Sequence, residues 1–222
     1  VGSITADINR GVNGEDNRDV ESNLGNLIAD AQLWATSSNG AQIAFMNPGG
    51  VRANLIYAQS AGEGDGVVTF AEAFAVQPFG NTLITFPMTG AQIISVLQQQ
   101  CQPAGLSRPF LHLGVSQGFA YDLSVAFGLV DHDNNPVTAP VNSCVSVSVT
   151  NVKLNGVPLD PAATYMVTVN NFLADGGDNF TTFRTVTAPR LDGGNDLLAF
   201  INFLGSFSPV APPGRDRVNE LP

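Results

Sequence analysis

Residues 170–180, with the sequence NNFLADGGDNF, hold side chains that suit a ligand carrying a ring and hydroxyl groups. Phe172 and Phe180 supply flat apolar faces, while Asp175 and Asp178 supply hydrogen-bond acceptors. The two glycines between the acidic residues permit a positive φ angle and let a ligand approach the backbone closely. A tight turn after a strand, with both phenylalanines in the core, is the alternative interpretation of the same segment.

A second segment, NPGGVR at residues 47–52, offers groups that suit an anion or the polar edge of a ring. Asn47 supplies an amide, and the backbone N–H groups of Gly49 and Gly50 can come close to an anion. Arg52 adds a guanidinium three residues after the first glycine. We expect a loop here, because proline and paired glycines interrupt regular structure.

A third loop is predicted at QPFGNT, where Phe79 stands between a proline and a glycine. A ligand with an aromatic base, ribose hydroxyls and a phosphate could use all three loops, since rings stack, a carboxylate binds hydroxyls and a guanidinium binds the charge. Stacking of one base on an aromatic side chain contributes about 1–3 kcal/mol. The three loops together favour a binding site for such a molecule.

Catalytic motifs are scarce by comparison. His112 and His132 are the only histidines, and no set of histidine, cysteine and carboxylate residues has the spacing of metal ligands. The G-x-S-x-G motif and the P-loop are both absent, and Cys101 has no base near it in the sequence. We therefore predict no catalytic residue and no metal site in this chain.

Composition limits the class of protein. The chain has 222 residues, of which 44% are hydrophobic, and its formal net charge is −10. This length suffices for one sizeable domain or two small ones. The acidic balance disfavours nucleic acid and acidic membrane surfaces as partners, and no apolar run is long enough to predict a membrane span. Cys101 and Cys144 either form one disulfide or remain two buried thiols.

Periodicity and turn signals predict the elements that carry these loops. Residues 22–36 read as an amphipathic helix with Ser22 as its N-cap, and the T-x-x-Q pattern at 89–92 begins another helix. A short strand and helix are expected within 67–77, a last helix at 195–207, and further strands at 83–86, 110–115, 118–127, 145–154 and 164–174, with a hairpin turn at 155–156. Because helices and strands are interleaved with a hairpin, we expect an α+β fold: a single domain with a mixed β-sheet and flanking helices.

An ordered set of motifs between about Leu24 and Arg217 resembles one known family. The motifs are NLGNLIADA, NPGGVR, QPFGNTL, FLHLGVSQGFAYDLS, VKLNGVPLDPAATYMVTVNNFLADGGDNF and SPVAPPGRDRV. Together they closely resemble the C-terminal domain of the 5′-nucleotidase family, which includes UDP-sugar hydrolases and cyclic nucleotide phosphodiesterases. NFLADGGDNF is highly specific to that family.

The resemblance implies a role for each candidate residue of the three loops. It implies that two phenylalanines sandwich the base, that an amide reaches the base edge, that a carboxylate binds the ribose hydroxyls, that an arginine contacts the ribose–phosphate side, and that two glycines let the backbone come close. Among these expected substrate-binding residues, the phenylalanines are Phe79 and Phe172, and the amide is that of Asn47. The carboxylate is that of Asp178 and the arginine is Arg52. The glycines are Gly49 and Gly50.

The resemblance also implies a partner. In this family an N-terminal metallophosphoesterase domain holds two divalent metal ions and the catalytic residues, and rotation of the domains brings substrate to the metals. The D-x-H and G-N-H-[DE] motifs of that domain are absent, so residues 1–222 are expected to form the substrate-binding domain only, which binds but does not hydrolyse. Family resemblance further implies an extracellular, cell-surface or periplasmic location.

Two alternatives remain open from the sequence. The chain is either a nucleotide-recognition domain or an interaction module that keeps the fold and has lost its ligand. The substrate of the parent enzyme is a nucleoside monophosphate, a UDP-sugar or a 2′,3′-cyclic nucleotide. One departure bears on both questions, because Ser38 stands near the place where some relatives carry another binding arginine.

Overall fold

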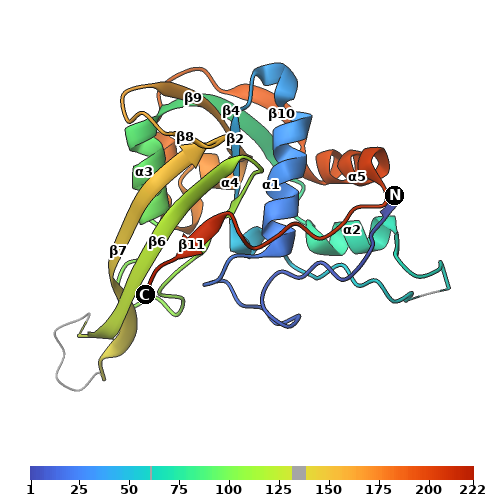
Figure 1. Cartoon of the computed structure of the whole chain (residues 1–222), viewed down its shortest axis with the longest axis horizontal. Coiled ribbons are helices and arrows are strands. Elements are labelled where there is room, and N and C mark those ends of the chain that lie inside the picture. Colours follow the sequence, from blue (N-terminus) through green and yellow to red (C-terminus); the bar gives the residue numbers. More distant parts are fainter. Residues whose placement is uncertain (61, 132–138) are drawn as a thin grey trace.

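The computed structural model describes residues 1–60, 62–131 and 139–222, and it has two large β-sheets with helices packed between and beside them (Figure 1). Within these residues the α+β prediction of a single domain with mixed sheets is confirmed. His132 lies outside the described residues. No helix in the described part of the chain is long and apolar enough to cross a membrane.

The first large sheet has the strand order β10-β4-β9-β2-β5. Its strands are β10 (Leu191–Asn195), β4 (Thr82–Thr89), β9 (Thr164–Asn170), β2 (Ile43–Met46) and β5 (Gly114–Val115). Strands β2 and β9 run parallel, and the other neighbours are antiparallel. The carboxyl ends of β2 and β9 therefore meet at one edge, where Asn47 follows β2 and Asn170 ends β9.

The second large sheet has the order β11-β6-β7-β8. Its strands are β11 (Val218–Glu220), β6 (Phe119–Val130), β7 (Val141–Leu154) and β8 (Val157–Pro158). The predicted hairpin turn at Asn155 and Gly156 is confirmed, since both adopt positive φ and Leu154 pairs with Val157. A small third sheet joins β1 (Gly2–Ser3) to β3 (Val67–Val68).

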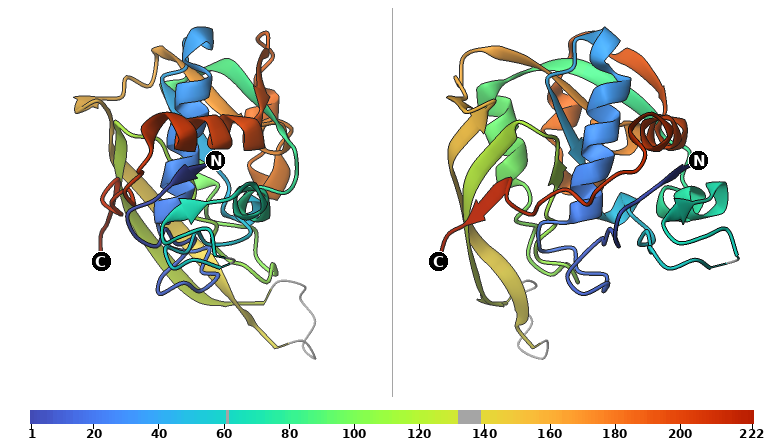
Figure 2. Two further views of the ribbon diagram at one scale, coloured as in Figure 1. Left: turned by 90° about the vertical axis from the view of Figure 1, so that its right-hand side faces the viewer. Right: turned by 45° about the vertical axis from the view of Figure 1, so that its right-hand side comes forward.

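Five α-helices in the described part of the chain have bounds that their capping residues explain. They are α1 (Asn23–Ala35), α2 (Phe70–Val76), α3 (Gly90–Gln98), α4 (Asn171–Ala174) and α5 (Asp196–Phe207). The predicted cap is present at α1, where the Ser22 hydroxyl accepts from the N–H of Gly25 at 3.0 Å. The predicted capping box of α3, made by Thr89 and Gln92, is also present. Figure 2 shows α5 crossing α1 beside the N-terminus.

Strand β2 separates two hydrophobic clusters, because its successive side chains point to opposite faces of the sheet. Ile43 and Phe45 join the cluster that fills the space between the two sheets and α3. Ala44 and Met46 join the cluster beneath α1 and α5. Full burial of a large apolar side chain stabilises a fold by about 1.5–3 kcal/mol, so both layers contribute to holding this strand in place.

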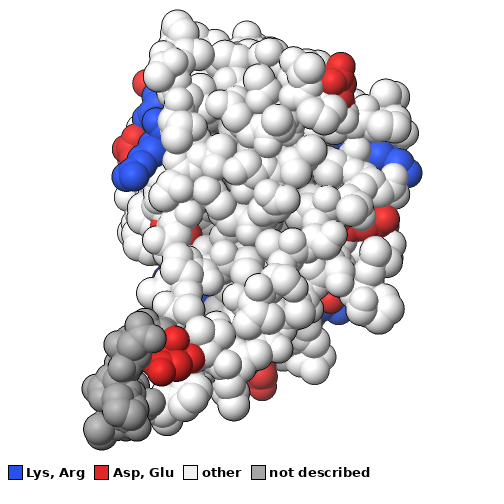
Figure 3. All heavy atoms as spheres, turned by 90° about the vertical axis from the view of Figure 1, so that its left-hand side faces the viewer, with Lys and Arg blue, Asp and Glu red and all other residues white. Residues whose placement is uncertain are grey.

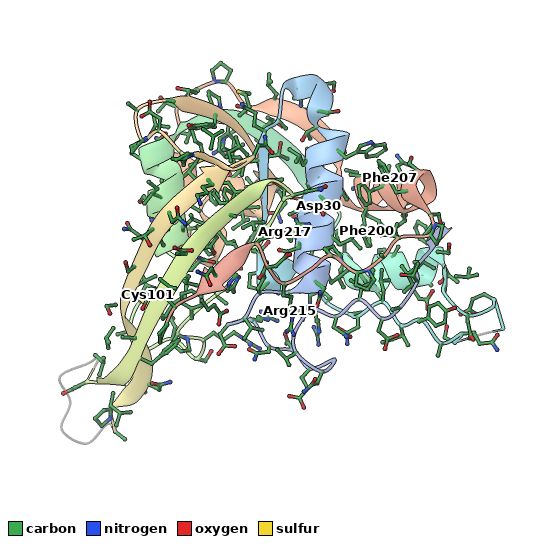
Figure 4. All side chains as sticks on the ribbon, in the orientation of Figure 1. Asp30, Cys101, Phe200, Phe207, Arg215 and Arg217 are labelled. Atoms are coloured by element: carbon green, nitrogen blue, oxygen red, sulfur yellow. A yellow bond between two sulfur atoms is a disulfide. The ribbon has the colours of Figure 1, made fainter. Side chains whose placement is uncertain are left out.

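Two long-range links fix the second sheet and the C-terminal tail. A disulfide joins Cys101, after α3, to Cys144 on β7, which settles the alternative that the sequence left open. The guanidinium of Arg217 in the tail points to Asp30 on α1 (Figure 4) and donates to both carboxylate oxygens, each at 2.7 Å. This bidentate pair is mostly buried, so the tail is held against α1 in one geometry.

Two predicted strands are longer than the strands that form, whereas those predicted at 83–86, 118–127 and 145–154 are present with longer bounds. The segment 110–115 forms a strand only at Gly114–Val115, because its other N–H groups donate elsewhere: Leu111 to the carbonyl of Gln100 and His112 to the carbonyl of Arg18. The strand predicted at 164–174 ends at Asn170, whose side chain accepts from the N–H of Leu173 and thereby begins helix α4.

Candidate functional site

A cavity of about 350 Å³ opens where β2 and β9 end. Six of the seven predicted substrate-binding residues line it, and two further residues line it that the sequence did not suggest. The predicted six are Asn47, Gly49, Gly50, Phe79, Phe172 and Asp178, and the additional two are Arg18 and Asn81. The structure thus brings the three loops together around one space.

Both phenylalanines of the cavity are exposed. Phe79 is 58% exposed and Phe172 is 44% exposed, whereas Phe180 at the end of the same loop is completely buried. The core interpretation of the loop 170–180 therefore holds for Phe180 alone. An exposed ring beside a cavity has a free face on which a flat ligand can stack. Stacking would also bury apolar surface that is otherwise in contact with water.

The paired glycines serve two different purposes. Gly176 follows helix α4 with a φ of 87°, a left-handed conformation that glycine adopts without strain. Gly177 gives room to Phe172, because a Cβ added at residue 177 would overlap the phenylalanine ring. The turn that follows carries Asp178 with a φ of 52°, so its carboxylate is delivered beside that ring.

A directed chain of hydrogen bonds holds Asp178. Asn170 accepts from the N–H of Leu173 at 2.9 Å through Oδ1, so its amide nitrogen faces outward and donates to Oδ1 of Asn47 at 3.0 Å. The Nδ2 of Asn47 then donates to Oδ2 of Asp178 at 2.9 Å. Both asparagines are almost fully buried. Among the described residues no hydrogen bond reaches the second oxygen of Asp178, Oδ1, which is left as an acceptor.

Arg18 brings positive charge to the cavity. It lies close to Gly49, since a Cβ added at that glycine would be 3.2 Å from Nη1 of Arg18 and 3.3 Å from Oδ2 of Asp178. The absence of a side chain at residue 49 therefore keeps open the space between the cation and the carboxylate. No motif marks Arg18 in the sequence. The only signal is that basic residues are scarce: lysine and arginine together number 9, so each one is a candidate anion ligand.

Three arginines surround a single carboxylate next to this point. Asp16 lies 3.2 Å from Arg18, 3.4 Å from Arg108 and 3.9 Å from Arg10. Partial burial alone would raise the pKa of Asp16, but its hydrogen bond with Arg18 and the charges of all three arginines together hold that pKa below its usual range. The group keeps an excess of positive charge beside the cavity, which favours an anion there.

Arg52, the seventh predicted residue, is placed differently. Its guanidinium carbon lies 5.9 Å from the centroid of the Phe79 ring, and Nη1 donates to the carbonyl of Gly49 at 3.3 Å. It does not line the cavity. This geometry makes a cation–π contact that supports the ring, and the predicted contact with a ribose–phosphate stays a prediction.

Asn81 lines the cavity from the loop after Phe79 and is held by a buried carboxylate. Its Nδ2 donates to Oδ2 of Asp196 at 3.1 Å, and the N–H of Asp196 donates to the carbonyl of Asn81 at 2.9 Å. The pKa of Asp196 lies above its usual value, because burial raises it by more than the hydrogen bonds from Asn81 and neighbouring N–H groups lower it. Because Asp196 comes from a distant helix, no local pattern in the sequence points to this pair.

Ser38 and His112 both lie outside the cavity. Ser38 lies in the 3₁₀ turn Ser37–Asn39 after α1 and does not line the cavity, so the cavity's arginine comes from the segment before α1. Burial lowers the pKa of His112 to about 4, and its ring lies inside the core. No group of three histidine, cysteine or carboxylate residues in the described part of the chain could hold a metal ion.

Comparisons with known proteins show the family of the chain. The profile of the family described as "5′-nucleotidase, C-terminal domain" matches residues 1–185. The chain is 35% identical over 189 residues to the cell wall protein Lmo0130 of Listeria monocytogenes, covering 84% of this chain and 21% of that protein. It is 32% identical over 206 residues to the trifunctional nucleotide phosphoesterase protein YfkN of Bacillus subtilis, covering 92% of this chain and 13% of that protein.

A solved structure shows the same fold. The 5′-nucleotidase precursor from Thermus thermophilus superimposes with a TM-score of 0.71 at 31% identity, covering all of this chain and 39% of that one. The chain thus spans well under half the length of the relatives that it matches. Family profile, relatives and fold agree, and the chain belongs to the family of 5′-nucleotidase C-terminal domains.

Proposed function

We propose that this chain is the nucleotide-recognition domain of a 5′-nucleotidase-type phosphohydrolase. The observation that carries the proposal is the cavity in which two exposed phenylalanines, a carboxylate and an arginine from separate segments of the chain meet. That combination matches a ligand with a flat base, a sugar with hydroxyls and a phosphate.

Each group has a defined task in this proposal. Phe79 and Phe172 stack on the base, and Asp178 accepts hydrogen bonds from the ribose hydroxyls through its free Oδ1. Asn47 keeps Asp178 in place through one N–H of its amide and offers the other N–H to the base edge, as predicted for it. Arg18 supplies charge for the phosphate, and Gly49 and Gly50 let the ligand approach the backbone.

Hydrolysis requires a second domain in this proposal. An N-terminal metallophosphoesterase domain with two divalent metal ions would supply the activated water, and this chain would hold the substrate. The described residues contain no donor set for such metals. We therefore expect binding without phosphate release from the 222-residue chain alone.

We place the parent protein outside the cytoplasm. The disulfide between Cys101 and Cys144 supports this, because such bonds persist mainly in oxidising compartments. The similarity to a cell wall protein of Listeria monocytogenes points the same way.

The test is a calorimetric titration of the chain with adenosine, AMP, UMP and UDP-glucose, with phosphate release assayed in the same samples after addition of Mn²⁺. A domain that forms only half of a site should bind weakly, with a dissociation constant of about 1 mM, equivalent to about −4 kcal/mol. A Phe79→Ala, Phe172→Ala double variant should lose that binding. Metal-dependent phosphate release by the pure chain would contradict the division of labour.

The alternative functions make different predictions in the same experiment. An interaction module that has lost its ligand would bind none of the four compounds. Preference for UDP-glucose over UMP would indicate a nucleotide-sugar hydrolase as the parent. A 2′,3′-cyclic nucleotide added to the series separates the phosphodiesterase alternative, since the base-binding half is shared and only the phosphate substituent differs.

A further inference from the structure

The outer edge of strand β7 is open along most of its length. Strand β7 pairs with β6 on one side over nearly all of its residues. On the other side β8 pairs only with Lys153 and Leu154, so among the described residues no strand covers 141–151 there. An open edge presents a row of N–H and C=O groups that can pair with another strand.

The open edge is regular over 146–150, between bulges at Val145 and at 151–152, and this stretch has little protection against pairing with another strand. Charged side chains and proline usually block an open edge, and the segment 141–152, VNSCVSVSVTNV, contains neither. Val145, Val147 and Val149 alternate with serine along it, and β-branched residues favour extended pairing. Val145 is 53% exposed although it is apolar.

The surface around this edge is also uncharged. Helix α3 and the residues that follow it to Ser107 contain no charged residue, and the disulfide holds this segment against β7. Figure 3 looks onto this side of the molecule, and its centre shows no Lys, Arg, Asp or Glu, which gather around the margin. Two copies of a chain with a net charge of −10 repel one another, and an uncharged side is where they can approach closely.

The opposite edge of the same hairpin is less suitable. Strand β11 pairs with β6 only at residues 121–123, so β6 also has an open stretch. Carboxylates flank that stretch, since Asp19 and Glu220 lie in the same surface depression as Val125 and Phe127. Pairing through β6 would bring acidic groups of two copies together.

We propose that β7 pairs with β7 of a second copy, in antiparallel orientation about a twofold axis, to form a continuous sheet across two chains. A twofold interface requires a surface that complements itself, and an antiparallel pair of identical strands satisfies this. With the axis at Ser148, within the regular stretch 146–150, Val147 lies opposite Val149 of the second copy and Ser146 lies opposite its Thr150. Apolar side chains then meet on one face and hydroxyls on the other.

Sedimentation velocity of the full chain, from about 10 μM to about 1 mM, tests this proposal. The disrupting variant is Ser148→Lys, on the open edge. Its matched control is Ser124→Lys, because Ser124 is the cross-strand partner of Ser148 on β6 and receives the same charge on the same face. Far-UV circular dichroism checks that both variants fold.

We expect dimers of the wild type and of Ser124→Lys, with the dissociation constant of Ser148→Lys raised at least about tenfold. Raising the salt concentration should strengthen the dimer, because it screens the repulsion between two acidic copies. Backbone amides within 143–151 should exchange more slowly at dimer-forming concentrations. A chain that stays monomeric at about 1 mM in high salt overturns the proposal, as does a dimer that both variants weaken equally.

Discussion

The side chain of Asn170 donates to Oδ1 of Asn47 at 3.0 Å, and this single contact decides which end of the Asn47 amide faces Asp178. Because Oδ1 of Asn47 is engaged by Asn170, its NH₂ group must point to the carboxylate. A residue that does not line the cavity therefore orients two that do.

Replacing Asn170 by serine should separate this orienting role from its capping role. Serine still caps helix α4, so we expect the loss of stability to be confined to about 1–3 kcal/mol for the buried Oδ1 of Asn47 that loses its donor. Its side chain is too short to reach Asn47, and the affinity for adenosine should fall about five- to tenfold, as expected for one lost hydrogen bond. Calorimetric titration measures this affinity.

The matched control for Asn170→Ser is Asn171→Ala at the neighbouring position. The side chain of Asn171 accepts from the N–H of Thr82 at 2.9 Å and makes no contact with Asn47. We expect this control to retain the affinity of the wild type for adenosine. Equal losses in both variants would argue against an orienting role for Asn170.

Arg18→Met should weaken the binding of AMP more than the binding of adenosine. A lost charged hydrogen bond to phosphate costs about 1.5–3 kcal/mol, or roughly ten- to a hundredfold in affinity, while adenosine lacks the phosphate. Arg108→Met is the matched control, because Arg108 also contacts Asp16 but does not line the cavity. If the two ligands lose affinity equally in Arg18→Met, the arginine does not bind phosphate.

Gly177→Ala should displace the ring of Phe172, since the added Cβ would overlap it. We expect the affinity for adenosine to fall about five- to a hundredfold, in line with about 1–3 kcal/mol for one stacking contact. Gly25→Ala serves as the control, because a Cβ there is 3.4 Å from its nearest neighbours and alanine favours the helix. Unchanged titration curves for Gly177→Ala would show that this ring does not contact the ligand.

His112 should make the stability of the chain depend on pH. Burial lowers its pKa to about 4 from the usual 6.5, so between these values the unfolded chain binds a proton that the folded chain does not. Stability is therefore lost as the pH falls from 6.5 towards 4, by up to about 3 kcal/mol.

Urea unfolding of the wild type and of His112→Gln across this pH range measures the contribution of the histidine. The raised pKa values of Glu21 and Asp196 act in the opposite sense, and they cancel in this comparison because both proteins carry them. A difference in stability that does not vary with pH would mean that the pKa of His112 is the same in the folded and the unfolded chain.

Local signals in the sequence reach part of the site and stop where long-range contacts begin. Phe79 and Asp178 stand in turns that glycine and proline mark, and Phe172 stands in the short helix α4 just before such a turn, so their types and positions can be read along the chain. Arg18 and Asn81 belong to the cavity through contacts with distant backbone and with Asp196, which no short pattern encodes.

The same limit explains the error at residues 110–115. The apolar side chains of this segment do enter the core, as the pattern indicates, with Phe110, Leu111 and Leu113 all buried. Its backbone instead bonds to Gln100 and Arg18, and Leu113 donates to the side chain of Gln100 at 2.8 Å. Hydrophobic content predicts burial, but the hydrogen-bond partners of the backbone decide whether a buried segment is a strand.

The parallel pairing of β2 and β9 has a consequence for how such a site tolerates change. Asn47 and Asn170 meet at one sheet edge although 123 residues separate them along the chain. The distance between them in space depends on the register of two strands and is independent of the length of the chain that connects them. Insertions and deletions between these strands can therefore accumulate in surface loops without moving the ligand groups, and a search for related sites should compare paired strand ends rather than contiguous motifs.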